Sequence, residues 1–166
     1  MDTREQRISE AIRRLARRLP RDADGKIDYS ESPVALSVTV FIKYRSQILL
    51  LKRSDKVRTY QGKWCPVTGY LEELKPIRKK ALEEVQEETG ISGKSIASIH
   101  IGKPYEFKDP KLGVTWIDHP VLLELKKKPD IELDWEHTEY RWINPEELDN
   151  FDTVPELHKT LENALR

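Results

Sequence analysis

The sequence of 166 residues has little of several things that would narrow its class. Cys65 is its only cysteine, so the chain can form neither an internal disulfide nor a cysteine zinc cluster, and a reducing compartment suits it. No apolar run is long enough to span a bilayer. The N-terminus lacks the apolar core of a signal peptide, and Glu5 and Glu10 argue against a transit peptide. These absences predict a cytoplasmic protein with no membrane partner.

An excess of charge of one sign is also missing. The chain has 29 basic and 29 acidic residues and a formal net charge of zero, so no global field indicates a nucleic-acid partner. The charge is nevertheless uneven, because seven arginines lie within the first 21 residues against three acids. With 37% hydrophobic residues, a chain of this length is expected to fold around one core rather than remain disordered.

The basic N-terminal segment has a helical pattern. Apolar residues recur at helical spacing over 3–19, and Pro20 is expected to end the helix. Residues 21–33 are polar and are expected to form a linker. We therefore divide the chain into a basic helix and linker at 1–33 and a main domain at 34–166. The apolar stripe of the helix consists of Ile8, Ile12, Leu15 and Leu19.

Strand and helix patterns are interleaved along the main domain. Strands are expected at Val34–Tyr44, Gln47–Arg53, Trp64–Tyr70, Ser95–Phe107, Val114–Leu125 and Tyr140–Ile143, and helices at Pro76–Glu88, Pro145–Leu148 and Pro155–Leu165. This order predicts an α/β fold in which a mixed β-sheet is sandwiched between helices, preceded by the basic helix.

The helix expected at Pro76–Glu88 is unusually acidic on one side. On a helical wheel with Glu84 at zero, Glu88 lies at about +40° and Glu87 at about −60°, next to the apolar stripe. Glu83 points away, at about −100°. Like charges at this spacing repel each other, and a divalent cation would remove the repulsion. Oxygen ligands favour Mg²⁺ or Mn²⁺ over zinc. The alternative is a glutamate-rich helix that is simply solvated.

The flanking residues favour the metal interpretation. Gly69, followed at the correct spacing by Glu84-Val85-Gln86-Glu87-Glu88-Thr89-Gly90-Ile91, resembles the Nudix box. The segment Gly62–Pro66 is similar to the one that often precedes the box, and Glu136–Trp142 is similar to a late strand of many members. The resemblance covers roughly Val34 to Leu165.

Three positions depart from the family pattern. Lys75 stands where the first glutamate of the box is expected, and Glu83 stands where the family has an arginine. In the family these two positions form an ion pair, so Lys75 and Glu83 would form it with reversed polarity. Thr68 replaces a glycine, and Val67-Thr68-Gly69 resembles the variant of bacterial dihydroneopterin triphosphate pyrophosphohydrolases.

The resemblance implies a Mg²⁺-dependent pyrophosphohydrolase (Mn²⁺ as an alternative ion) that acts on a nucleoside triphosphate or another nucleoside diphosphate derivative. It implies that Glu84, Glu87 and Glu88 are catalytic residues that hold the metal, together with the carbonyl of Gly69. The general base would be one of these glutamates or Glu136, for which a solvated loop is the alternative.

Other residues are candidates for binding the substrate. Arg53 ends a strand where family members often contact phosphate. Tyr70 and Trp116 are candidates for stacking on a base, as are Tyr105 and Phe107, although buried aromatics are more often core. The remaining candidates, His119, His137 and Cys65, are expected to be incidental, the histidines on loops and the thiol packed in the interior.

Two other functions stay open. Lys75 and Glu83 would suit a catalytically impaired Nudix-fold module that binds or regulates, and the arginine-rich helix would suit RNA binding. We expect that helix to dock its apolar stripe on the body or on a second subunit of a homodimer rather than to bind RNA.

Overall fold

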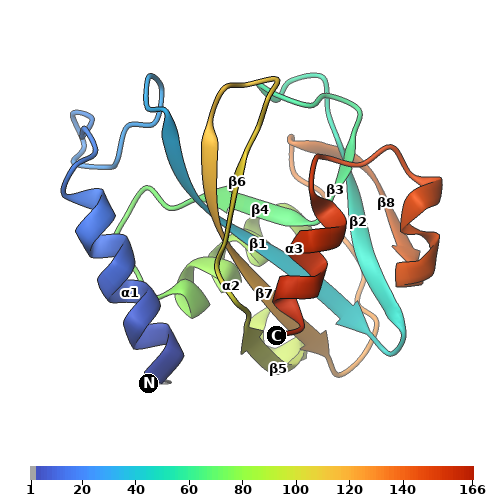
Figure 1. Cartoon of the computed structure of the whole chain (residues 1–166). Coiled ribbons are helices and arrows are strands. Elements are labelled where there is room, and N and C mark those ends of the chain that lie inside the picture. Colours follow the sequence, from blue (N-terminus) through green and yellow to red (C-terminus); the bar gives the residue numbers. More distant parts are fainter. Residues whose placement is uncertain (1–2) are drawn as a thin grey trace.

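The protein is built around one mixed β-sheet (Figure 1), which the computed structural model describes within residues 3–166. Its main path runs β3-β2-β1-β7-β5, with β4 beside β1, β6 beside β7 and β8 beside β2. Strands β1 and β7 are parallel, and the other pairs are antiparallel. The strands are β1 (Val34–Tyr44), β2 (Gln47–Arg53), β3 (Trp64–Cys65), β4 (Val67–Tyr70), β5 (Ile96–Ile101), β6 (Tyr105–Lys108), β7 (Thr115–Leu125) and β8 (His137–Ile143).

Helices cover both faces of this sheet, which confirms the predicted sandwich (Figure 1). The larger core lies against α1 and α2, and a smaller core lies against α3 and η2. The helices are α1 (Thr3–Ala16), α2 (Ile77–Thr89) and α3 (Leu157–Ala164), with 3₁₀ turns η1 (Gly93–Ser95) and η2 (Pro145–Asn150).

Strand β1 divides its side chains between the two cores. Leu36, Val38 and Val40 pack with the α2 core, whereas Phe41 packs with the α3 core. Because side chains alternate along a strand, Ser37 and Thr39 lie on the α3 face. Polar residues in the middle of a buried strand mark the part of the sheet that forms the pocket described below.

The N-terminal helix docks on the body of the protein. Ile8 and Ile12 are buried in the larger core, while Leu15 is 36% exposed. Glu5 is also buried, and its carboxylate accepts a hydrogen bond from the backbone N–H of Arg78 at 3.1 Å. Because Pro76 provides no side-chain cap for α2, α1 satisfies one of the free N–H groups of that helix.

Several predicted boundaries were wrong. The expected strand at Ser95–Phe107 is divided into β5 and β6, and α1 ends three residues before Leu19. The segment at 21–33 is packed rather than free, because Ile27 is buried and the Tyr29 hydroxyl donates to the Leu71 carbonyl at 2.6 Å. Pro145–Asn150 forms a 3₁₀ turn instead of an α-helix.

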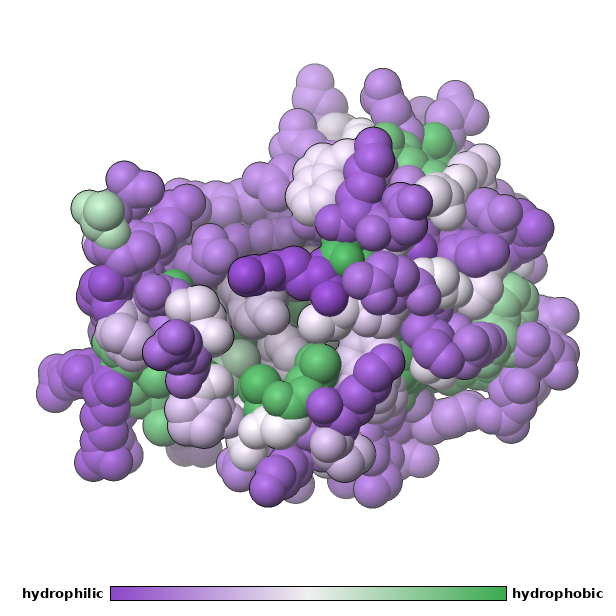
Figure 2. All heavy atoms as spheres, turned by 90° about the horizontal axis from the view of Figure 1, so that it is seen from above, coloured by the Kyte–Doolittle hydropathy of each residue, from purple (hydrophilic) through white to green (hydrophobic). Residues whose placement is uncertain are grey.

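The surface is mostly hydrophilic, as Figure 2 shows for one face. Hydrophobic residues appear there only in small patches. Over the described residues 3–166, no helix has the length and apolar character needed to cross a membrane.

Candidate active site

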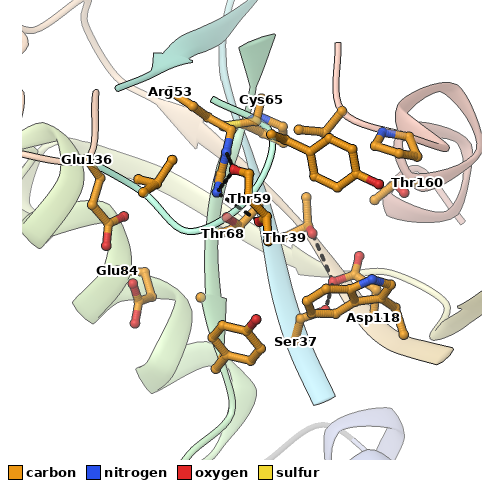
Figure 3. Close-up of a pocket in the computed structure, with 18 of the residues that line it drawn as sticks. Ser37, Thr39, Arg53, Thr59, Cys65, Thr68, Glu84, Asp118, Glu136 and Thr160 are labelled. Atoms are coloured by element: carbon orange, nitrogen blue, oxygen red, sulfur yellow. Dashed lines mark hydrogen bonds between the residues drawn. The ribbon is translucent and has the colours of Figure 1, made fainter. Parts of the chain in front are cut away.

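A cavity of about 430 Å³ opens beside α2 and the strands β1, β4 and β7 (Figure 3). Figure 3 shows Glu84 and Glu136 at one end and Asp118 at the other, and Glu87 and Trp116 also line the cavity. The predicted site residues Arg53, Gly69 and Tyr70 also line it. The structure therefore brings together most of the residues that the sequence singled out.

Glu84 lies directly against β4 at Gly69. A methyl group at Gly69 would come 2.7 Å from Oε1 of Glu84, so only glycine leaves room for this carboxylate. Lys80, one turn earlier on α2, holds the same oxygen in an ion pair of 2.6 Å. Burial raises the pKa of Glu84, and the Lys80 ammonium opposes that rise. Glu87 lies on the exposed side of α2 and also faces the cavity.

Glu88 has a different environment from the other two helix glutamates. It is only 1% exposed, and neither of its side-chain oxygens has a hydrogen-bond partner among the described residues. One ligand atom each from Glu88, Glu136 and His137 lies within 4.8 Å of the others. Burial, followed by the charges of Glu136 and Glu84, raises the pKa of Glu88 well above its usual value.

This cluster fits a divalent cation. Unpartnered buried carboxylate oxygens are costly, and a cation would satisfy them and offset the repulsion from Glu136. Glu136 lies on the turn before β8, is partly buried, and contributes one of the ligand atoms of the cluster. The donors are mainly carboxylate oxygens, which suit Mg²⁺ or Mn²⁺.

Lys75 and Glu83 form an ion pair. The Lys75 ammonium lies 3.0 Å from a carboxylate oxygen of Glu83 and 3.0 Å from one of Glu73. Hydrogen bonds with Glu83 and then Glu73 raise the pKa of Lys75. The pair of reversed polarity is therefore present, although the helical wheel directed Glu83 away from the core.

Arg53 anchors the loop that follows β2. Its guanidinium donates through Nε and Nη2 to the carbonyl of Thr59, at 3.0 and 2.8 Å. The next residue, Tyr60, donates from its hydroxyl to the buried Asp109 at 2.5 Å. Arg53 therefore stabilises the loop at Thr59, which forms part of the cavity wall, and Arg53 itself also lines the cavity.

The aromatic candidates form two separate pairs. Tyr70 and Trp116 line the cavity with ring centroids 5.6 Å apart. Tyr105 and Phe107 stack on each other at 5.5 Å, and of these two Phe107 lines the cavity. The Tyr105 hydroxyl instead donates to Glu156 at 2.9 Å.

The histidines do not lie on loops, so that expectation was wrong. His119 is buried on β7, and His137 is buried at the start of β8. His137 approaches Asp134 with Nδ1 at 3.3 Å and Glu88 with Nε2 at 3.5 Å. Burial lowers the pKa of each histidine. Cys65 is packed as predicted, and burial raises the pKa of its thiol to about 12.

Three residues that line the cavity were not predicted from the sequence: Asp118, Ser37 and Thr39. Figure 3 shows the two hydroxyl groups donating to the Asp118 carboxylate. A signal was present in the sequence, since an aspartate within a strand of mainly apolar residues is costly unless it is paired. The partners lie about 80 positions earlier in the chain, so only the pairing of β1 with β7 reveals them.

Comparisons with known proteins agree with this geometry. The model of the NUDIX domain matches residues 25–164. The chain belongs to the Nudix hydrolase family. A mouse relative, bis(5'-nucleosyl)-tetraphosphatase (asymmetrical), is 30% identical over 124 residues, which cover 71% of this chain and 78% of the relative.

Solved Nudix structures show the same fold. The MutT protein from Methanosarcina mazei Go1 is 29% identical with a TM-score of 0.61, covering 82% of this chain and 96% of the other. A C. elegans Ap4A hydrolase binary complex is 19% identical with a TM-score of 0.64, covering 78% and 93%. At 19% identity, the similarity to the Ap4A hydrolase shows a shared fold and nothing more.

Proposed function

We propose that this Nudix hydrolase splits a phosphoric anhydride bond in a nucleotide derivative with the help of Mg²⁺ or Mn²⁺. Glu84, Glu87 and Glu88 would hold the ion, together with the carbonyl of Gly69. The observation that carries the proposal is the pair of unpartnered, buried Glu88 oxygens, which lie next to Glu136, a residue that lines the cavity.

The rest of the cavity suits a nucleotide. Arg53, Arg58 and Lys80 line it and supply positive charge for phosphate groups. Tyr70 and Trp116 supply aromatic surface on which a base can stack. We place the substrate among nucleoside triphosphates and dinucleoside polyphosphates, in line with the name of the mouse relative.

The residues of this chain have separate tasks in the reaction. A bound Mg²⁺ or Mn²⁺ would neutralise phosphate oxygens and lower the pKa of attacking water. Lys80 holds the Glu84 carboxylate in place through their 2.6 Å ion pair. Glu136 is the candidate general base, because burial and the charges of Asp134 and Glu84 raise its pKa towards the range in which a carboxylate accepts a proton effectively.

The test is a substrate panel with and without Mg²⁺ or Mn²⁺. It would contain nucleoside triphosphates, nucleotide sugars, dinucleoside polyphosphates and capped RNA. We expect metal-dependent product from at least one class, and a loss on the order of a hundredfold or more in Glu87→Gln and Glu88→Gln. Glu146→Gln, an exposed glutamate on η2, is the matched control.

Two outcomes would contradict the proposal. Turnover that survives both substitutions would show that these glutamates are not the metal ligands. Binding without turnover on every substrate would instead favour the impaired binding module that Lys75 and Glu83 suggested. The cytoplasmic location and the homodimer stay predictions, and RNA contact by α1 stays the untested alternative to its docking.

A further inference from the structure

Asp118 is a second buried carboxyl group in the cavity, away from the glutamates of α2. It is 2% exposed, and its Oδ2 has no hydrogen-bond partner among the described residues. Its other oxygen, Oδ1, accepts hydrogen bonds from Ser37 at 2.7 Å and Thr39 at 2.8 Å. The two hydroxyl groups hold Oδ1, and Oδ2 is a buried acceptor without a donor among the described residues.

The surroundings of Asp118 suit a flat ring with polar edges. Trp116 lies two residues before Asp118 on β7, its ring is 5.6 Å from that of Tyr70, and Phe107 pairs with Trp116 in the register of β6 and β7; all three line the cavity. Burial raises the pKa of Asp118 to about 6, against the opposing effect of the Ser37 and Thr39 hydroxyls, so the group is largely ionised at neutral pH. A buried ionised carboxylate requires a donor, and the edge of a nucleobase can supply one.

The sheet also sets the distance between the two ends. In the register, Asp118 pairs with Ser37, and the next residue of β1, Val38, pairs with Gly69. Asp118 is therefore two strand spacings from the strand of Gly69, or roughly 10 Å. That span is comparable with a nucleoside lying between a metal-bound phosphate and a recognised base edge.

We propose that Oδ2 of Asp118 accepts a hydrogen bond from an exocyclic amino group of the nucleobase, and that Asp118 thereby selects purines with an amino group over those with a carbonyl or hydrogen in its place. This inference rests on the proposed function, because it takes the cavity to be a nucleotide site. A carbonyl oxygen in the same position would face a carboxylate without a proton between them, which disfavours binding.

The hydroxyl pair makes the effect of Asp118→Asn specific. Ser37 and Thr39 donate their protons to the oxygen at the Oδ1 position, so they would hold the amide oxygen there. The amide NH₂ would then occupy the Oδ2 position and offer a donor where the wild type offers an acceptor. The substitution therefore removes the preference for an amino group and favours a carbonyl.

The experiment measures equilibrium binding of nucleoside 5′-diphosphates by calorimetry. Adenosine diphosphate is compared with inosine diphosphate, which has a carbonyl in place of the amino group at position 6. Guanosine diphosphate is compared with inosine diphosphate, which lacks the amino group at position 2. In at least one pair we expect the wild type to bind the amino nucleotide about tenfold to a hundredfold more tightly. Asp118→Asn should reduce that ratio to below about threefold or reverse it.

Two further variants complete the design. Asp149→Asn, an exposed carboxylate on η2, should keep the wild-type ratio. Ser37→Ala removes one of the two donors that fix Asp118, so it should reduce the ratio without abolishing binding. This milder variant provides the test if Asp118→Asn does not fold.

Three results would overturn the inference. They are equal binding within both pairs by the wild type, an unchanged ratio in Asp118→Asn, and no binding of any nucleoside diphosphate. Failure of the proposed hydrolysis looks different, because the substrate panel would then give no product while the binding preference for amino nucleotides remained.

Discussion

Two buried carboxyl groups have opposite settings: Glu88 lies next to Glu136 at the acidic end of the cavity, and Asp118 lines the other end. Glu88 lies among other acids, so its pKa is raised by burial and then by the charges of Glu136 and Glu84. Asp118 instead lies among hydroxyl groups, and burial alone raises its pKa, to about 6. A cluster of carboxylates favours a bound cation, whereas a single carboxylate that accepts hydrogen bonds from hydroxyl groups favours an uncharged hydrogen-bond donor.

The largest expected effect is a loss of turnover at the acidic end of the cavity without a change in base preference at the Asp118 end. Glu88→Gln should lower kcat on the best substrate by about a hundredfold or more, because the cluster loses a buried charge. The preference for amino nucleotides in binding should stay within about threefold of the wild type, since Asp118 is untouched. Steady-state kinetics and calorimetry check the two parts. A variant that loses both would show that the ends are not independent.

The second effect concerns stability and pH. Because the pKa of Asp118 rises from 3.8 to about 6 on folding, burial destabilises the charged form of the group relative to the protonated form in the folded state. Its contribution is therefore fully present below pH 3.8 and is lost as pH rises through about 6. Relative to Asp118→Asn, the wild type should lose about 3 kcal/mol of unfolding free energy between acid and mildly alkaline pH.

Urea unfolding of both proteins at about pH 4 and about pH 8 measures this difference. The comparison is between the two proteins at each pH, so other titrating groups largely cancel. Parallel changes in the wild type and the variant would contradict the burial of an ionised Asp118.

A smaller effect tests the close approach at the acidic end. In Gly69→Ala, the new methyl group would displace the Glu84 side chain. We expect about a tenfold loss of kcat, since small shifts of a catalytic group are costly, and a stability loss of roughly 1 kcal/mol. Gly93→Ala is the control, because nothing lies within 4 Å of its added methyl group. Equal activity of the two variants would refute the packing argument.

The smallest effect belongs to the reversed ion pair. Lys75→Glu places a third acid beside Glu73 and Glu83, so Tm should fall by about 1–3 °C. Adding Glu83→Arg restores an attractive pair with the family's polarity. Recovery should be partial, because Glu73 still repels the new acid. Thermal unfolding of the single and double variants measures it, and additive losses would show that the two residues are not coupled.

The acidic end was predictable because its signals are local. The helical spacing of the glutamates and the glycine at its end define α2, and Gly90 has the left-handed conformation expected there, with φ of 74°. The resemblance to the Nudix box also implied that Gly69 and Glu84 belong to one metal site. Helical periodicity could not show that Glu88 is buried with His137, because that depends on how β8 passes α2.

The other end depends on contacts between distant segments. Asp118 meets Ser37 and Thr39 only because β7 runs parallel to β1 in one register. The break between β5 and β6 has a similar origin. Gly102 lies against the backbone of Asn163 in α3, and the next backbone N–H, of Lys103, donates to the Asn163 carbonyl at 2.9 Å instead of to a neighbouring strand. Neither register nor helix docking is encoded in a short window of sequence.

The Lys75–Glu83 pair also has a consequence for how this branch of the family diverged. Reversing either charge alone brings two like charges together, so the change from one polarity to the other is least costly through a neutral residue or two coordinated substitutions. The two positions should therefore vary together among descendants. Homologues that keep the lysine should keep the acid, and those with the usual glutamate should have the arginine, which makes this pair a marker of ancestry.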